Sequence, residues 1–253
     1  MIGKVTLVGA GPGDPELLTF KAARAIGRAT VLLVDDLVSD GVLAFASQGA
    51  RIVHVGKRGG CASTPQAFIE KLMLAEALKG EEVVRLKGGD PFMFGRGGEE
   101  AAHLRAHGID VDVVGGITSG MAAASSLGVP LTHRDHAHGV IFVTGHARAG
   151  GHTLDWPTLG AAAAKGLTLV IYMGVSSIDT LQAGLLETLP AATPAAVIQH
   201  ASLPHQRQLV CVLGELAAQV HAERIASPAI VVVGNVLSGI ATLSQAAQTA
   251  QAA

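Results

Sequence analysis

Short runs of continuous apolar, mostly β-branched residues recur along the chain, and most of them end in glycine or in a polar turn. A strand that reads as an unbroken apolar run is typical of a sheet covered on both faces. In the first half of the chain these runs alternate with helical stretches, which predicts a parallel α/β sheet. The strands expected there span residues 5–11, 30–36, 50–56, 81–89 and 109–116, and the helices span 16–29, 40–49, 64–80 and 95–108.

The second half has strand patterns of the same kind, but the segment QHASLPHQRQ predicts an antiparallel hairpin between residues 195–201 and 208–214. The second sheet is therefore expected to be mixed, with flanking helices. We predict an α/β protein of two domains, residues 1–115 and 116–253, and an Ala/Gln-rich tail over 242–253 that frays. The remaining strands of this half are expected at 139–146, 167–174 and 229–235.

Composition excludes several classes of protein. The 18 Lys and Arg against 20 Asp and Glu give a net charge of −2, whereas nucleic-acid binders usually show a basic excess. The densest apolar runs have about half of the ~20 residues that a membrane helix needs, so no membrane association is expected. With two cysteines and a strand pattern that begins directly after Met1, the chain is expected to be cytoplasmic and reduced.

The segment GAGPGD (9–14) invites comparison with the dinucleotide fingerprint G-x-G-x-x-G. Gly9 and Gly11 match its first two glycines, but Asp14 stands in place of the third, and Pro12 has no backbone N–H for a pyrophosphate. Asp35 ends the second strand, where a dinucleotide enzyme would grip a ribose. An NAD-dependent oxidoreductase and a purely structural turn both stay open on these residues alone.

The segment KGGDPFMFGRGGEE (87–100) has the most specific pattern. Its double glycine follows a strand, at the carboxyl end where open α/β sheets bind ligands. The loop combines exposed backbone with a Phe-Met-Phe wall, which suits an adenosine or amino-acid group better than a bare phosphate. Glu99 and Glu100 fall in the first turn of the next helix, where acidic residues complement the helix dipole.

Two further segments carry candidate ligand residues. VGKRGG (55–60) places two cations in a glycine loop after a strand, which favours anion binding. HRDHAHG contains His133, His136 and His138 with metal-like spacing. No cysteine pair or carboxylate cluster accompanies these histidines, so we expect an anion-facing or solvated loop and no metal.

The chain resembles the uroporphyrinogen-III C-methyltransferases of the tetrapyrrole methylase family from about residue 3 to 240. The matching segments are VTLVGAGPGDPELLTFKAARAI, VDDLVS, VGKRGG followed by STPQ, RLKGGDPFMFGRGGEE, GGITSG, GVPLTHRD, VTGH and YMG. As a set they are highly specific, although the opening segment is shared with sister methylases of corrin synthesis. The VGKRGG–STPQ and PLTHRD segments indicate the uroporphyrinogen branch.

The resemblance implies a two-domain α/β fold, a homodimer, and S-adenosylmethionine (SAM) bound in the cleft between the domains. It implies methylation of uroporphyrinogen III at C2 and C7, which yields precorrin-1 and then precorrin-2, with two S-adenosylhomocysteine (SAH) released. Precorrin-2 feeds cobalamin, sirohaem or haem d1, and the sequence leaves these three open. A sister enzyme that methylates a later precorrin is the alternative within the family.

The resemblance also assigns roles to residues. The acid–base and substrate-side positions are Asp35, Lys57, Arg96 and Glu99. The SAM-contact positions are Pro12, Gly88, Gly89, Asp90, Met93, Thr118, Ser119, Met173 and Ala201. Val34, Asp36 and Ala201 depart from the family pattern. The cations expected to bind the eight carboxylates of the substrate are Lys57, Arg58, Arg85, Lys87, Arg96 and Arg134.

Overall fold

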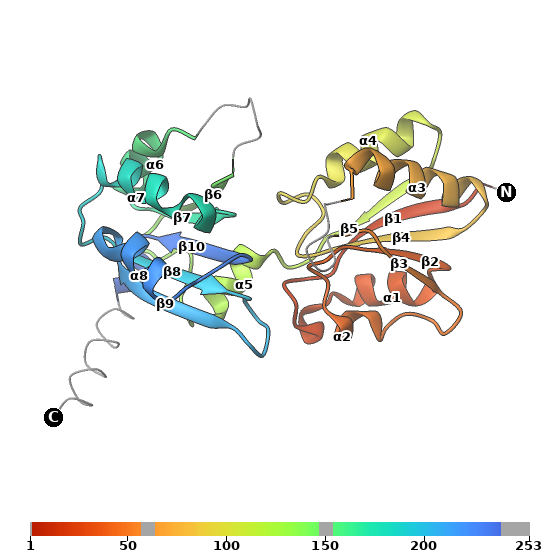
Figure 1. Cartoon of the computed structure of the whole chain (residues 1–253), viewed down its shortest axis with the longest axis horizontal. Helices are drawn as coiled ribbons and strands as arrows, with labels where there is room; N and C mark the ends of the chain where they lie inside the picture. The colour runs from red at the N-terminus through yellow and green to blue at the C-terminus, as the bar shows by residue number, and fades with distance from the viewer. Residues whose placement is uncertain (1, 57–63, 147–153, 239–253) are drawn as a thin grey trace. The chain divides into compact units, whose positions relative to one another are not determined.

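The computed structural model describes residues 2–56, 64–146 and 154–238 (Figure 1). The chain divides into two compact units, Met1–Ser119 and Gly120–Ala253. The sequence placed the corresponding boundary after residue 115. The tail that was expected to fray, residues 242–253, lies outside the described residues.

The first unit is built on a five-stranded sheet in which all strands run parallel. In spatial order the strands are β3 (Arg51–His54), β2 (Val31–Val34), β4 (Glu82–Lys87), β1 (Lys4–Gly9) and β5 (Val111–Val114). β2 is buried along its whole length and β4 from Val83 onward, as the continuous apolar runs predicted. Because the strands are parallel, their carboxyl ends share one edge of the sheet.

Helices cover both faces of this sheet (Figure 1). They are α1 (Phe20–Arg28), α2 (Asp40–Leu43), α3 (Gln66–Leu78) and α4 (Gly97–Ala106). α1 and α2 form one core layer, in which Ile26 packs with Leu32. α3 and α4 form the other, in which Met73 and Leu104 pack with Leu33. Burying side chains of this size contributes about 1.5–3 kcal/mol each, so both layers hold the sheet edge in place.

The second unit is built on a mixed five-stranded sheet, which confirms the predicted α/β class. In spatial order its strands are β6 (Gly139–Thr144), β7 (Leu167–Tyr172), β10 (Ala229–Val233), β8 (Pro194–Gln199) and β9 (Arg207–Val212). Only β6 and β7 pair in parallel. The predicted hairpin is confirmed as the antiparallel pair of β8 and β9.

Three helices pack on one face of the second sheet, where Trp156, Leu181 and Leu216 share a core with Ile171 and Val231. They are α6 (Trp156–Ala163), α7 (Ile178–Leu186) and α8 (Leu216–Ala222). The remaining elements are α5 (Ser119–Ser126) and the 3-10 turns η1 (Pro15–Leu17), η2 (Val175–Ser177), η3 (Leu213–Glu215) and η4 (Asn235–Leu237). None of the helices that the structure describes has the length and apolarity required to cross a bilayer.

Glu76 on α3 is a buried acid with two cationic partners, and it provides a test of the fold. Its Oε1 accepts from Lys79 Nζ at 3.0 Å, and its Oε2 pairs with Arg51 at the start of β3. The hydrogen bond from Arg51, and then the one from Lys79, hold the pKa of Glu76 below its ordinary value of 4.5. A depressed carboxyl pKa stabilises the fold above the unfolded-state pKa, and this stability is lost as the pH falls through the folded-state pKa.

We therefore expect Glu76→Gln to lower the free energy of unfolding by about 1–3 kcal/mol at pH 7. The difference from the unsubstituted protein should shrink as the pH falls from 4.5 through the lower folded-state pKa, because Glu76 is protonated first in the unfolded state and only then in the folded state. Urea unfolding at pH 7 and at a series of lower pH values measures this. A difference that stays constant down to acid denaturation would show that the charge of Glu76 does not stabilise the fold.

Candidate functional site

The loops after β1 and β4 meet at the carboxyl edge of the first sheet. Gly11 N donates to Gly89 O at 3.2 Å, and Gly89 N donates to Gly11 O at 2.7 Å. Ala10 N also donates to Lys87 O at 2.8 Å, so the pairing of β1 with β4 continues into the two glycine loops. The segments GAGPGD and KGGDPF, which the sequence singled out separately, therefore form one structure.

The loop after β5 crosses the same place, and glycine makes the crossing possible. A Cβ on Gly116 would lie 2.3 Å from Gly89 O and 2.9 Å from the Cα of Gly9. A Cβ on Gly9 would lie 2.6 Å from Gly89 O. All of these neighbours are backbone atoms, which cannot move aside as a flexible side chain can. Three loops thus contact one another through bare backbone.

Asp90 fastens the crossing through its carboxylate. Its Oδ2 accepts from Gly116 N at 3.0 Å, and its Oδ1 accepts from Phe92 N at 2.8 Å. The side chain therefore joins the loop after β4 to the loop after β5. This arrangement gives Asp90 a clear structural task alongside the ligand contact that the sequence predicted for it.

A Cβ on Gly89 would clash with nothing, but it would lie in van der Waals contact with the start of α5. The φ of Gly89, +67°, is left-handed, a conformation that glycine adopts without the strain a side chain would bring. The atoms nearest to a Cβ built on it are Ser119 Oγ at 3.7 Å and Thr118 Cα at 3.8 Å. The structure thus brings six of the predicted cofactor residues to one sheet edge: Pro12, Gly88, Gly89, Asp90, Thr118 and Ser119. Met93 follows in the loop that leads to α4.

Asp35 directly follows β2 at the same edge of the sheet. Its N–H donates to Leu86 O at 3.0 Å, and its Oδ1 accepts from Asp36 N at 3.0 Å. Because β4 lies between β1 and β2, Asp35 is two strand spacings, roughly 10 Å, from the end of β1. In a dinucleotide-binding fold the glycine turn also leads straight into a helix, whereas here the chain first passes through η1. Both features argue against the NAD alternative.

Arg96 and Glu99 form an exposed ion pair where the loop enters α4. Arg96 Nε lies 3.1 Å from Glu99 Oε1, and Nη2 lies 2.5 Å from Oε2, with about half of each side chain exposed. The hydrogen bonds that Arg96 donates to Glu99 raise the pKa of its guanidinium. Arg96 itself has a left-handed φ of +60°. Lys57, the fourth acid–base candidate, lies outside the described residues, as does Arg58.

Arg85 and Lys87 are not where the sequence expected them. Both were predicted to bind substrate carboxylates, but they are only 2% and 3% exposed and both pair with Glu100 on α4. Burial, together with the nearby charge of Arg85, lowers the pKa of Lys87. The expectation was wrong because both side chains point from β4 into the core layer under α3 and α4. Arg134 is exposed, as a ligand-binding cation needs to be.

In the second unit the two remaining cofactor candidates lie at one end of the sheet. Met173 follows β7, and Ala201 lies two residues after the end of β8. Both strands flank β10, where Tyr172 pairs with Ile230 and Gln199 pairs with Ala229. Met173 has a φ of +53° and a half-exposed side chain, whereas Ala201 is buried. The predicted cofactor residues are thus divided between the units, seven in the first and two in the second.

The histidine segment forms a small turn that is held by contacts within the segment itself. His133 Nδ1 accepts from Asp135 N at 3.1 Å, and the rings of His133 and His136 stack at 4.6 Å. In the ranges 2–56, 64–146 and 154–238, no group of three His, Cys, Asp or Glu side chains is arranged to hold a metal ion. That the protein needs no metal stays a prediction.

Sequence reasoning missed two parts of this framework. The hydroxyl of Tyr172 accepts from Gly120 N at 2.8 Å and fastens the start of α5, a contact that the sequence did not indicate. Glu100 was weighed as a helix-dipole residue, yet it is fully buried among cations. A polar residue inside an otherwise apolar helix face is the available signal for Glu100, whereas nothing in the sequence indicates the partner of Tyr172.

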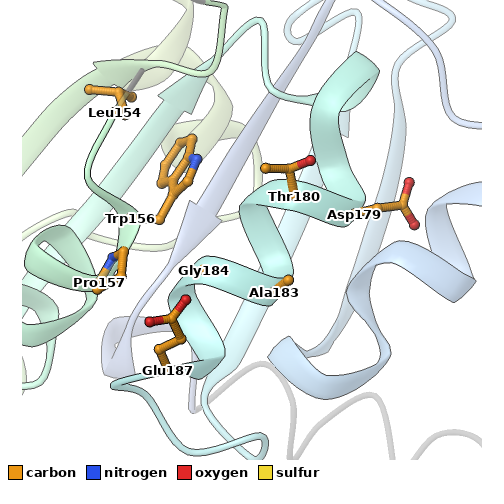
Figure 2. A pocket seen from close by; sticks show the side chains of 8 residues that line it. All are labelled: Leu154, Trp156, Pro157, Asp179, Thr180, Ala183, Gly184 and Glu187. Atoms are coloured by element: carbon orange, nitrogen blue, oxygen red, sulfur yellow. The ribbon is translucent and has the colours of Figure 1, made fainter. Parts of the chain in front are cut away.

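An open depression of about 530 Å³ lies on the second unit between α6 and α7 (Figure 2). Trp156 and Pro157 from α6, and Asp179 and Glu187 from α7 and its end, are among the residues that line it. None of its lining residues belongs to the predicted sites, so volume alone does not locate the chemistry here.

Comparison with known proteins adds to this geometry. Residues 4–217 match the family model of the tetrapyrrole (corrin/porphyrin) methylases. The chain is 52% identical over 241 residues to a uroporphyrinogen-III C-methyltransferase of Pseudomonas aeruginosa, covering 95% of this chain and 96% of that protein.

Solved structures agree with this match. A uroporphyrin-III C-methyltransferase of Thermus thermophilus in complex with SAH is 41% identical and superposes with a TM-score of 0.77, covering 93% of this chain and 99% of that one. A cobalt precorrin-4 methyltransferase of cobalamin biosynthesis superposes with a TM-score of 0.82 but is 26% identical, covering 92% of this chain and 95% of that one.

The loop crossing can be tested at Gly116, with Gly98 as the matched control. Gly116→Ala should lower the free energy of unfolding by about 2–3 kcal/mol, because its Cβ would overlap backbone that cannot give way. Gly98 lies in the first turn of α4 with no atom within 4 Å of its Cβ position, so Gly98→Ala should leave stability unchanged or raise it by up to about 1 kcal/mol. Denaturant unfolding of both variants measures this, and equal effects would contradict the crossing.

Proposed function

Because the chain belongs to the tetrapyrrole methylase family, we propose that it is a SAM-dependent uroporphyrinogen-III C-methyltransferase. It methylates uroporphyrinogen III at C2 and C7 to give precorrin-1 and then precorrin-2, with two SAH released. The observation that carries the proposal is the 52% identity, along 96% of its length, to a protein with this activity in its name.

The glycine edge of the first unit fits the cofactor. A nucleoside and an amino-acid group need backbone N–H and C=O groups that side chains do not screen, and the glycines at this edge carry no side chains that would screen them. We propose that Pro12, Gly88, Gly89, Asp90, Met93, Thr118 and Ser119 hold SAM from the first unit, and that Met173 and Ala201 hold it from the second. When bound, SAM supplies an electrophilic methyl group.

The protein contributes position and proton transfer. In a displacement at a methyl carbon, most of the catalysis comes from aligning the reacting atoms, which can lower the barrier by several kcal/mol. Methylation of the reduced tetrapyrrole carbon also requires loss of a proton. We propose Asp35, Lys57 and the Arg96–Glu99 pair as the groups that bind the substrate and move this proton, and general acid–base help typically contributes 10²–10⁴-fold.

The exposed guanidinium groups suit a polyanionic substrate. Arg96 is half exposed and fully charged, because Glu99 raises its pKa further. An arginine can pair with a carboxylate through two parallel hydrogen bonds, which fixes orientation as well as charge. Arg96 and Arg134 are therefore proposed as carboxylate contacts, whereas Arg85 and Lys87 are excluded by burial.

A later precorrin remains the alternative substrate within the family, and the 26% identical cobalt precorrin-4 methyltransferase represents that class. The higher identity to the uroporphyrinogen enzymes supports the first proposal. The homodimer and the cytoplasmic location are also proposals, and light scattering after size-exclusion chromatography tests the first of them.

The decisive experiment is incubation of the purified protein with uroporphyrinogen III and SAM carrying a labelled methyl group. Transfer of two labelled methyl groups per tetrapyrrole supports the proposal. Transfer only to a methylated precorrin would assign the protein to the sister class. Calorimetric titration with SAH and with NAD separates both from an oxidoreductase, since only SAH should bind.

Asp35→Asn tests the acid–base role of this residue, with Asp40→Asn as the matched control. Asparagine keeps the shape of the side chain but loses the charge, so single-turnover methyl transfer should slow by roughly 10²-fold or more while SAH affinity changes little. Asp40 is exposed in the first turn of α2, and its variant should turn over normally. Normal turnover by Asp35→Asn would remove Asp35 from the mechanism and leave Arg96 and Glu99 as the next candidates.

A further inference from the structure

A cluster of buried charge lies inside the first unit, in the layer between the sheet and the helices α3 and α4 (Figure 1). Arg85 and Lys87 alternate with Leu86 on β4, so both point to the same face of the sheet. Glu100 projects from the first turn of α4 and is 0% exposed. These three charged side chains are more deeply buried than Asp35, Arg96 and Glu99, the acid–base candidates that the structure describes.

One carboxylate oxygen of Glu100 accepts hydrogen bonds from both cations of the cluster. Its Oε1 accepts from Lys87 Nζ at 3.1 Å, from Arg85 Nε at 3.3 Å and from Gln66 Nε2 at 3.0 Å. Arg85 also donates through Nη1 to Leu33 O at 3.2 Å, on the neighbouring strand β2. The first residue of α3, the first turn of α4 and the end of β4 are thereby joined at a single atom.

The place of the cluster in the chain gives it a function. Lys87 is the residue immediately before the double glycine, and Glu100 is the residue immediately after Glu99. Their ion pair therefore closes the loop of residues 88–99 at its base. That loop carries six proposed site residues, four for SAM and two for the substrate: Gly88, Gly89, Asp90, Met93, Arg96 and Glu99.

The loop needs such a fixed base, because its own backbone is unusual. Gly89, Phe94 and Arg96 all have left-handed φ values, between +54° and +67°. Non-glycine residues keep this conformation only where the surrounding structure holds them in it. A buried ion pair contributes little net stability, because a protein in which apolar side chains of the same volume replace the pair is often equally stable. Stability alone therefore does not account for the cluster.

We propose that Glu100 and Lys87 are positioning residues, whose buried ion pair holds loop 88–99 in the conformation that binds SAM and presents Arg96 and Glu99 to the substrate. This inference rests on the proposed function for the identity of the ligands. The effect of the ion pair on the conformation of the loop does not depend on that function. Arg85 and Gln66 orient the carboxylate of Glu100 and so support the pair.

Two variants test the pair. Lys87→Met leaves Arg85 and Glu100 as a balanced pair of opposite charges in the core, so this variant is expected to fold. Glu100→Gln keeps the shape of the side chain but leaves two cations without an anion. Both should raise the Kd for SAH by about 10-fold or more and slow methyl transfer, because displacements of about 1 Å in a site can cost 10²-fold.

Glu76→Gln is the matched control, since Glu76 is another buried acid with two cationic partners but touches no part of loop 88–99. It should leave SAH affinity unchanged. Hydrogen exchange, measured without ligand, should speed up in residues 88–99 of Lys87→Met and Glu100→Gln but not of Glu76→Gln. The double variant Lys87→Met/Glu100→Gln should lose less SAH affinity than the product of the two single losses, because both break one interaction.

The outcomes separate this inference from the proposed function. Failure of the unsubstituted protein to methylate uroporphyrinogen III would overturn the proposed function, whereas the exchange measurement would still test the pair. If Lys87→Met matches Glu76→Gln in both SAH affinity and loop exchange, the pair does not position the loop and the inference is overturned. If Glu100→Gln does not fold, Lys87→Met decides alone.

Discussion

Close backbone contact between glycine segments, at the carboxyl edge of the first sheet, is the constraint on which the candidate site depends. Gly9 ends β1, whereas Gly89 and Gly116 lie in the loops after β4 and β5, and Cβ atoms on Gly9 and Gly116 would overlap the backbone of the other two segments. The reciprocal hydrogen bonds of Gly11 and Gly89 and the carboxylate of Asp90 then fix the crossing. A ligand that meets this edge meets peptide groups in fixed positions, which lowers the entropic cost of binding.

The order of the strands makes that contact possible. Because β4 is inserted between β1 and β2, the loop after β4 lies beside the loop after β1, and Asp35 is moved away from the loop after β1. A dinucleotide fold keeps β1 next to β2 and so brings its acidic residue to the glycine turn. Two folds with nearly the same glycine segment thus present different groups to a ligand, and strand order, rather than the segment itself, separates them.

Strand and helix patterns were sufficient to predict the α/β class, the parallel first sheet, the mixed second sheet and the β8–β9 hairpin, because each follows from local periodicity and turn residues. Local patterns also placed Gly89 and Asp90 at a strand end. Local patterns could not predict that Arg85 and Lys87 are buried. Two cations in a strand that ends in a glycine loop are equally compatible with the rim of a binding site. Their partner Glu100 lies on another element, and only the fold brings the three side chains together.

The separation of buried from exposed cations has a consequence for specificity. A protein of net charge −2 that binds a polyanion must place each of its exposed cations where a carboxylate falls. Arg85 and Lys87 are already neutralised in part by Glu100, so they add little field at the surface, and they act on the loop rather than on the ligand. The exposed Arg96 is then held near the end of a loop whose base is fixed by charge and whose start, at Gly89, is fixed by backbone contact. The proposed recognition of substrate carboxylates by Arg96 therefore depends on the geometry of this loop more than on the number of cations that the chain contains.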